Sequence, residues 1–274
     1  MRPMNWSKPP IAMVCRSEGN TPIPLDYVRK HQTMSAKANL IDLLWQGKKM
    51  FAFTVNEHVF NPADSIVGHK LVDLVLSEKI DVAQKDVIDL GCGSGVVGLC
   101  AILRKAKKVL FTDINSHIDG IQKHPFFRKT DQWQVQDVLV DVPDSSYDLV
   151  LVLPPWMMVE DGRQIASDTF ESGIFRTANL YHRILTESGR VLRAGGKLVV
   201  WLRIPIVGFD SLLQLLSTAA ERFDLTSMPL LAHGIESAIY LDHEKSMMNR
   251  WLYKIQKGGV QNDALWMLLS LKKR

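Results

Sequence analysis

The stretch VIDLGCGSGVVGL, residues 87–99, carries the strongest structural signal in this chain. Its apolar beginning predicts a buried strand, and the apolar residues after Gly95 predict a helix. Between them stand Gly91, Gly93 and Gly95, which permit positive φ and let the backbone approach a ligand closely. The helix would direct its N-terminal amide groups into the same crevice. The stretch therefore predicts a nucleotide-type site at the carboxyl end of the first strand of an open α/β sheet.

The spacing of the glycines narrows the class of ligand. Dinucleotide enzymes favour G-x-G-x-x-G, whereas here G-x-G-x-G follows Asp89. The chain thus resembles the class I S-adenosylmethionine-dependent methyltransferases, whose first motif reads D-x-G-x-G-x-G. The resemblance implies S-adenosylmethionine as cofactor, bound by Asp89, Gly91, Cys92, Gly93 and Gly95. It also implies a doubly wound, mostly parallel seven-stranded α/β sheet with an antiparallel last strand. Glycines needed only for close packing of strand and helix are the alternative.

A second acid follows the next predicted strand. Residues 107–113 (KKVLFTD) are apolar in the centre and end in Asp113. A carboxylate at this place can accept hydrogen bonds from both ribose hydroxyls of an adenosine. Dinucleotide-binding proteins also have an acid here, so Asp113 suits both classes of ligand. The neighbouring Ile114 is a further candidate for cofactor binding.

A third acid, Asp137, precedes the predicted fourth strand over residues 147–153 (YDLVLVL). Asp137 matches the family's acid that contacts the adenine amino group, and the adjacent Val138 joins it in the candidate cofactor site. A solvated aspartate in a turn is the alternative interpretation of Asp137.

The fourth strand ends in Leu153-Pro154-Pro155-Trp156. Two consecutive prolines end a central strand and hold its backbone stiffly. The sequence resembles the x-P-P-aromatic motif of the amino-methylating branch, which includes release-factor glutamine, ribosomal RNA guanine-N2 and adenine-N6 methyltransferases. The resemblance implies that the carbonyls of Leu153 and Pro154 orient a substrate amine and that Trp156 packs on the substrate. A strand stop with Trp156 in the core is the alternative.

Leu153 departs from this motif. The family usually has Asn, Asp or Ser, whose oxygen accepts a hydrogen bond from the amine, and Leu153 lacks such an oxygen. Methyl transfer moves a positive charge off sulfur, so in-line positioning can supply much of the acceleration. Leu153 therefore argues against assigning the family's substrate specificity to this chain. It also leaves open the alternative that the chain is a relative of these enzymes without catalytic activity.

These features predict an S-adenosylmethionine-dependent methyltransferase that N-methylates a small planar or amide-bearing molecule. A neutral amine needs no dedicated base, because its proton can leave to water after the transfer. A methyltransferase acting on RNA or a protein glutamine is the first alternative; the sequence contains no recognisable RNA-binding appendage. A non-catalytic partner subunit is the second, and the intact glycine loop opposes it.

The amino-acid composition narrows the class of protein further. Hydrophobic residues make up 46% of the 274 residues and charged residues 23%, as in globular proteins. The 3 cysteines form no C-x-x-C pair and the 8 histidines show no metal-ligand spacing, so no metal site is expected. The odd number of cysteines without a disulfide pattern predicts a reducing cytoplasm. Neither a membrane-spanning run nor a secretory signal is recognised, so no membrane contact is expected. The net charge of +4 permits nucleic-acid binding without indicating it, and the oligomeric state is not predicted.

Residues 1–80 are expected to form an N-terminal extension that covers the cofactor or substrate, and residues 81–274 the methyltransferase core. In the extension, residues 35–45 have helical spacing, and residues 51–55 and 58–60 predict a hairpin. A helix is predicted from about residue 63 to about residue 77. Its N-cap would be Asp64 or Ser65, and the candidate lid residues before it are Phe60 and Asn61, with core packing as the alternative.

The C-terminal half is predicted from weaker patterns. The loop over residues 157–169 is expected to line the substrate pocket. The remaining expected elements are a helix over 170–193, a strand over 197–203, a helix over 210–221 and a strand over 223–231. The last strand is either 236–243 or 264–271; the basic end of the chain favours the second. His233 is a candidate base near the pocket.

Overall fold

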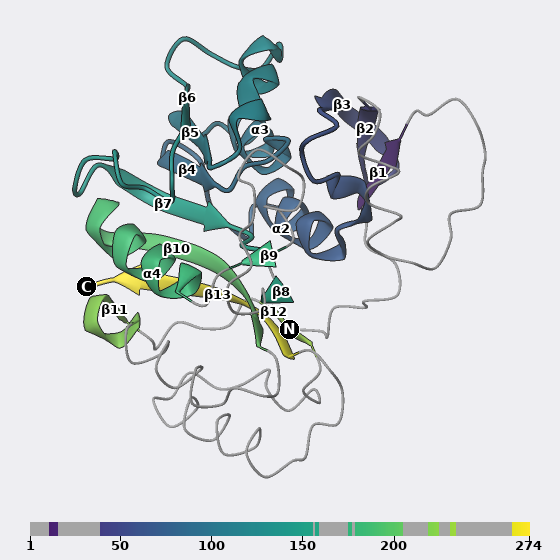
Figure 1. Ribbon diagram of the computed structural model, residues 1–274. Helices are drawn as coiled ribbons and strands as arrows, with labels where there is room; N and C mark the ends of the chain where they lie inside the picture. The colour runs from purple at the N-terminus through teal and green to yellow at the C-terminus, as the bar shows by residue number, and fades with distance from the viewer. Residues whose placement is uncertain are drawn as a thin grey trace.

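A parallel sheet forms the centre of the protein in the computed structural model (Figure 1). Its parallel strands lie in the order β6-β5-β4-β7-β10. Their bounds are β4 (Asp86–Leu90), β5 (Lys108–Asp113), β6 (Gln132–Val135), β7 (Tyr147–Val152) and β10 (Leu192–Ile204). The structure describes residues 11–15, 39–155, 157–158, 175–176, 179–204, 219–224, 231–233 and 265–274. The predicted strands over 107–113, 147–153 and 197–203 are confirmed.

An antiparallel strand closes the sheet beside β10. This strand, β13 (Leu265–Lys273), pairs with β10 from Lys197↔Lys272 to Ile204↔Leu265. β11 (Phe223–Asp224) and β12 (Leu231–His233) pair with two successive parts of β13, so together they occupy one edge position. The sheet thus has seven strand positions with an antiparallel last strand, as predicted, and that strand is the one expected over 264–271. Residues 225–230 and 236–243 lie outside the described residues.

The pleat of the central strands divides their side chains between two hydrophobic layers. Val87 and Phe111 belong to the layer that contains α2 and α3, whereas Ile88 and Leu110 belong to the layer that contains α4. All four side chains are at most 2% exposed, which explains why these strands read as continuous apolar runs. These helices are α2 (Ile66–Leu76), α3 (Val96–Leu103) and α4 (Leu180–Val191), and residues 219–222 are also helical. Helices on both faces of a mostly parallel sheet confirm the predicted doubly wound α/β fold.

The N-terminal extension contains a small antiparallel sheet of β1 (Ile11–Cys15), β2 (Asn39–Trp45) and β3 (Lys48–Val55). The helix predicted over residues 35–45 is therefore wrong. Ile41 and Leu43 are fully buried whereas Leu40 is 40% exposed, and this alternation is the period of a strand.

The extension contains a hairpin and residues 51–55 are a strand, as predicted, but the predicted second strand over 58–60 is wrong. Residues 51–55 instead pair with β2, and the turn between β2 and β3 is Gln46-Gly47, with φ of 51° and 76°. Positive φ at both central residues is typical of tight hairpin turns. Residues 58–60 form no strand. The functional division of the chain at residue 80 stays a prediction.

The helix expected from residue 63 to residue 77 is confirmed as α2. A short 3-10 turn, η1 (Pro62–Asp64), precedes it, and Asn61 caps that turn by accepting from the Ala63 amide at 2.9 Å. Ser65 is the N-cap of α2, because its Oγ accepts from the Gly68 amide at 2.9 Å.

The helix predicted from residue 170 begins later, at Leu180, because Phe175–Arg176 form β9, which pairs with β8 (Met157–Met158). The rest of the expected loop over 157–169 lies outside the described residues, and so does most of the expected helix over 210–221. Within the described part of the chain, no helix is long and apolar enough to cross a membrane.

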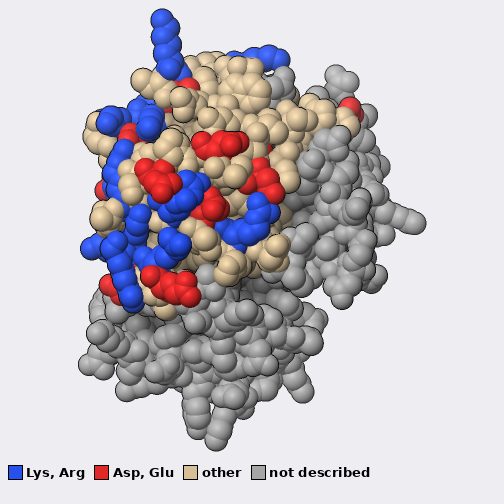
Figure 2. All heavy atoms as spheres, turned by 60° about the vertical axis from the view of Figure 1, so that its left-hand side comes forward, with Lys and Arg blue, Asp and Glu red and all other residues tan. Residues whose placement is uncertain are grey.

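A network of ion pairs joins the strands at their amino ends. Arg193 donates to Asp148 Oδ1 at 2.6 Å and to Asp86 Oδ2 at 2.9 Å. Asp148 in turn accepts from the Asp86 amide at 2.9 Å. Figure 2, which brings the left-hand side of Figure 1 forward, shows Lys and Arg interspersed with Asp and Glu. These contacts tie β4, β7 and β10 together at the edge opposite the glycine loop.

The first prediction concerns this network. Arg193→Ala is expected to lower the free energy of unfolding by about 1–2 kcal/mol, because it leaves the buried Asp86 carboxylate with weaker compensation. The exposed pair of Lys85 and Asp81 provides the control, and Lys85→Ala should cost less than about 0.5 kcal/mol. Urea denaturation of both variants measures the difference; equal losses would contradict the structural role of Arg193.

Candidate active site

The glycine loop leaves the carboxyl end of β4 with left-handed backbone at each of its glycines. The φ angles are 67° at Gly91, 51° at Gly93 and 74° at Gly95. A Cβ added at Gly95 would lie 2.9 Å from Ile121 Cδ1, so packing requires this glycine. A Cβ added at Gly91 would meet nothing within 4 Å. Packing therefore explains Gly95, whereas no protein atom stands where a side chain at Gly91 would begin.

Hydrogen bonds fix the loop to the neighbouring strand and helix. The amides of Gly91 and Cys92 both donate to the Thr112 carbonyl, at 2.8 and 3.1 Å. Asp89 Oδ2 accepts from the Gly98 amide of α3 at 2.8 Å. The Cys92 side chain is buried, and burial raises the pKa of its thiol well above the usual value. The thiol is therefore neutral, and Cys92 contributes a small side chain to the loop.

Burial also changes the acidity of Asp89, which is 4% exposed. Desolvation raises its pKa to about 7, the Gly98 amide opposes the rise, and the charge of Asp113 adds to it. Asp89 is thus close to half-ionised near neutral pH. Its carboxyl holds α3 to the end of β4 in either protonation state.

Asp113 at the end of β5 is the acid best placed to bind a ligand. Its Oδ2 accepts from the Gly93 amide at 2.8 Å and its Oδ1 accepts from the Asn115 amide at 2.9 Å. Burial raises the pKa of Asp113, and these amide donors oppose the rise. The amides of Asn115, Gly93 and Ile114 all act on this carboxylate. A carboxylate has about four lone-pair sites, so about one or two are left for a ligand such as a ribose hydroxyl.

The third predicted acid has a different partner. Asp137 Oδ2 forms an ion pair with Arg183 of α4 at 2.8 Å, with both side chains partly exposed. The next residue, Val138, is buried at a φ of 61°, an unusual conformation for a β-branched residue. Ile114 is 41% exposed beside Asp113. The structure thus joins Asp89, the glycine loop and Asp113 in one bonded unit, and it connects Asp137 to α4 instead.

At the predicted substrate end, Leu153 directly follows β7 and packs against the layer that contains α2. A Cβ added at Gly68 of α2 would lie 4.0 Å from Leu153 Cδ1. Pro154 is buried and Pro155 is half-buried. Trp156 lies outside the described residues, so its contact with a substrate stays a prediction.

Two further candidates stay predictions as functional residues. Phe60 is half-buried, and Asn61 is fully buried as the cap of η1. His233 lies opposite Trp266 in the pairing of β12 with β13, and its side chain is outside the described part of the structure.

The sequence interpretation missed Asn115 and Val59, which both lie at this site. Asn115 donates from Nδ2 to the His58 carbonyl, and Val59 lies against Gly93. A signal for Asn115 was present, because Asn before a helical turn is a typical N-cap. The hydrogen bond from Asn115 to His58 forms only in the folded chain, so the local sequence does not predict it.

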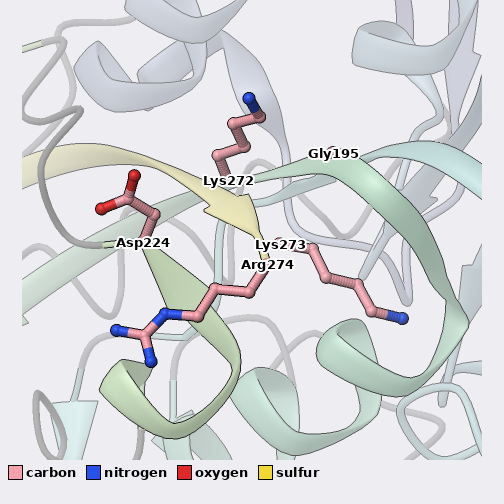
Figure 3. Close-up of a pocket in the computed structure, with 5 residues that line it drawn as sticks. All are labelled: Gly195, Asp224, Lys272, Lys273 and Arg274. Carbon is pink, nitrogen blue, oxygen red and sulfur yellow. The ribbon is translucent and has the colours of Figure 1, made fainter.

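A hollow of about 340 Å³ lies elsewhere in the molecule (Figure 3). It is lined by Gly195, Asp224, Lys272, Lys273 and Arg274, at the amino ends of the parallel strands. Ligands of doubly wound folds bind at the carboxyl ends, so this hollow is separate from the candidate site. Among the residues that the structure describes, no group of three or more His, Cys, Asp or Glu could hold a metal ion.

Comparisons with known proteins agree with this geometry. The family model described as "Methyltransferase small domain" matches residues 57–219. A protein named "Ribosomal RNA large subunit methyltransferase G" from Streptomyces coelicolor is 36% identical over 120 residues, 42% of this chain and 28% of that protein. One named "Putative protein N5-glutamine methyltransferase" from Methanocaldococcus jannaschii is 24% identical over 114 residues, 41% of this chain and 55% of that protein. The chain therefore matches about a quarter and about half of these two relatives' lengths.

A solved structure shares the fold. It is described as "a putative methyltransferase complexed with SAH", and its TM-score is 0.52 at 11% identity. The likeness covers 85% of this chain and 56% of that one.

The second prediction compares two glycines of the loop. Gly91→Ala should cost about 1–2 kcal/mol, the strain of a left-handed alanine, because its methyl group meets no protein atom. Gly95→Ala should cost about 1–3 kcal/mol more, because its methyl group would also displace Ile121. Denaturant unfolding of both variants measures this difference, and equal costs would show that Ile121 moves aside freely.

The third prediction follows from the pKa of Asp89. The folded state keeps this proton up to about pH 7, whereas the unfolded chain releases it near pH 4. This residue therefore destabilises the free protein progressively between about pH 4 and 7, and its effect is constant at higher pH. The free energy of unfolding of the wild type minus that of Asp89→Asn should fall across this window. A difference that does not change with pH would refute the raised pKa.

Proposed function

Because the chain belongs to the methyltransferase small domain family, we propose that it is an S-adenosylmethionine-dependent methyltransferase acting on nitrogen. The observation that carries this proposal is the hydrogen bond that joins the glycine loop to Asp113. A Cβ at Gly91 would meet no protein atom, and Asp113 retains about one or two lone-pair sites beside the amides of Asn115, Gly93 and Ile114. When bound, the cofactor supplies a methyl group activated by its positively charged sulfur.

In this proposal, different elements of the fold contact different parts of the cofactor. Asp113 accepts from the ribose hydroxyls, and the open backbone around Gly91 admits the part of the cofactor that lies along the loop. Asp89 keeps the loop in shape through its bond to Gly98. Contacts to the adenine are assigned to a group of residues at the ends of β5 and β6. These are Ile114, Asp137 and Val138.

For Asp137, the proposal has a structural consequence. Its carboxylate is paired with Arg183 in this structure, so an adenine amino group would share that carboxylate with the guanidinium. Both side chains are partly exposed, and such pairs are weak enough for this sharing.

For the methyl acceptor we propose a nitrogen on a small planar or amide-bearing molecule. The Leu153 side chain packs over Gly68, so orientation of the nitrogen is assigned to the main-chain carbonyls of Leu153 and Pro154. A carbonyl accepts from an N–H group, and a planar group suits the flat face of Trp156. The amine attacks the methyl carbon as the bond to sulfur breaks, and its proton then leaves to water.

A macromolecular acceptor is the second candidate. The two relatives described above carry the names of a ribosomal RNA methyltransferase and a protein N5-glutamine methyltransferase. RNA bases and glutamine amides both carry planar nitrogen-bearing groups, which is consistent with the same carbonyl arrangement. The catalytically silent alternative is opposed by the intact glycine loop bonded to Asp89 and Asp113, since a protein without a cofactor has no need of this arrangement. The cytoplasmic location expected from the cysteine content stays a prediction.

Labelling of a cell extract distinguishes the acceptors. The protein is incubated with the extract and radiolabelled S-adenosylmethionine, and the small-molecule, RNA and protein fractions are counted separately. Label in the small-molecule fraction supports the first proposal, whereas label confined to RNA or protein supports the second. If no fraction is labelled although the cofactor binds, the silent relative is supported.

The fourth prediction tests the cofactor site directly. Asp113→Ala should weaken S-adenosylhomocysteine binding by about 1.5–3 kcal/mol, roughly 10- to 150-fold, because it removes charge-assisted hydrogen bonds to the ribose. Asp81→Ala removes an exposed acid at the other edge and should leave the affinity unchanged. Isothermal titration of the wild type and both variants gives the three affinities. The assignment of Asp113 fails if the two variants bind equally well.

A further inference from the structure

Residues 56–61, here called the covering segment, connect β3 to η1 and lie against the glycine loop. Val59 is 3% exposed, and its Cγ1 would be 3.5 Å from a Cβ added at Gly93. The Val59 amide donates to the Asn56 carbonyl at 3.0 Å, and Asn56 Oδ1 accepts from the His58 amide at 2.9 Å. The segment therefore has a defined turn that presses an apolar side chain onto the loop.

Asn115 links this segment to the acid at the end of β5. It is 4% exposed, and its Nδ2 donates to the His58 carbonyl at 2.9 Å. Its Oδ1 accepts from the His117 amide at 2.9 Å, and its own amide donates to Asp113 Oδ1 at 2.9 Å. One buried side chain thus uses both of its polar atoms to hold two segments together.

These contacts form a closed ring. From the covering segment they run through Asn115 to Asp113, from Asp113 Oδ2 to the Gly93 amide, and from Gly93 back to Val59. Moving the covering segment away from the loop requires breaking the bond from Asn115 to His58 and separating Val59 from Gly93.

A second contact lies on the solvent side of this ring. The rings of His58 and His117 are stacked, with centroids 4.3 Å apart and planes 24° from parallel. His58 Nε2 also lies 3.5 Å from Glu57 Oε1. The side chains of His58 and Glu57 are 46% and 54% exposed, so the buried amide of Asn115 is the stronger of the two connections.

We propose that Asn115 is a positioning residue that keeps the covering segment closed over the cofactor site and thereby slows cofactor release. The inference rests on the proposed function, because it concerns a cofactor bound between Gly91 and Asp113. A ligand held there lies next to the covering segment, and the donor that holds this segment comes from the residue bonded to the ribose acid. Occupation of Asp113 and closure of the segment are therefore mechanically linked.

The test uses Asn115→Ser in the full chain. Serine keeps an oxygen that can cap the His117 amide, but it lacks the amide donor that reaches the His58 carbonyl. Two measurements follow: hydrogen–deuterium exchange of the backbone amides in residues 56–61 without ligand, and the dissociation rate of S-adenosylhomocysteine. Both rates are expected to rise about three- to tenfold, the effect of losing one hydrogen bond. Exchange in β4 should stay unchanged. Ser116→Ala, at the exposed neighbouring position, is the matched control and should alter neither rate.

The outcomes separate this inference from the proposed function. If the wild type binds no S-adenosylhomocysteine, the proposed function fails and the inference fails with it. If the wild type binds but Asn115→Ser releases the ligand at the wild-type rate, only the inference is overturned. Exchange in the wild type gives a check that needs no variant, because S-adenosylhomocysteine should slow exchange in residues 56–61. An unchanged exchange rate on binding would also overturn the role given to the covering segment.

Discussion

The site depends on two backbone amides that donate to carboxylates at the ends of adjacent strands. Gly98 donates to Asp89 and Gly93 donates to Asp113, so one loop is fixed to β4 and β5 at once. Left-handed φ at the glycines allows the loop to take this course. At the start of the loop, the amides of Gly91 and Cys92 donate to the Thr112 carbonyl. Each acid satisfies a buried amide and is itself partly desolvated. Burial raises the pKa of both acids, and the same amides that fix the loop oppose that rise.

The central sheet could be predicted because its signals are local. Strands β4, β5 and β7 are apolar runs bounded by acids, glycines or prolines, and burial on both faces produces such runs. Residues 39–45 were misread because Leu40, Leu43 and Leu44 fit a helix as well as Ile41 and Leu43 fit a strand. Pairing with β3 decides between the two periods, and that pairing is a tertiary contact.

The same distinction applies to the site. The motif predicted the positions of Asp89, the glycines and Asp113, and the structure places them in one bonded unit. The motif did not predict the ion pair between Arg183 and Asp137, because α4 meets the end of β6 only in the folded chain. Asn115 was missed for the same reason, since its partner is 57 residues away in the sequence.

Leu153 and Gly68 have a consequence for redesign. The leucine that replaces the polar residue of related motifs extends over a helix position that has no side chain. A shorter polar residue grafted at 153 would remove this apolar contact with α2 and leave a void there, whereas a side chain added at 68 would first meet Ser65, at 3.0 Å from its Cβ. Restoring a polar side chain at 153 therefore changes the packing against α2 as well as the polarity at the end of β7, so the neighbouring apolar side chains would have to be redesigned with it.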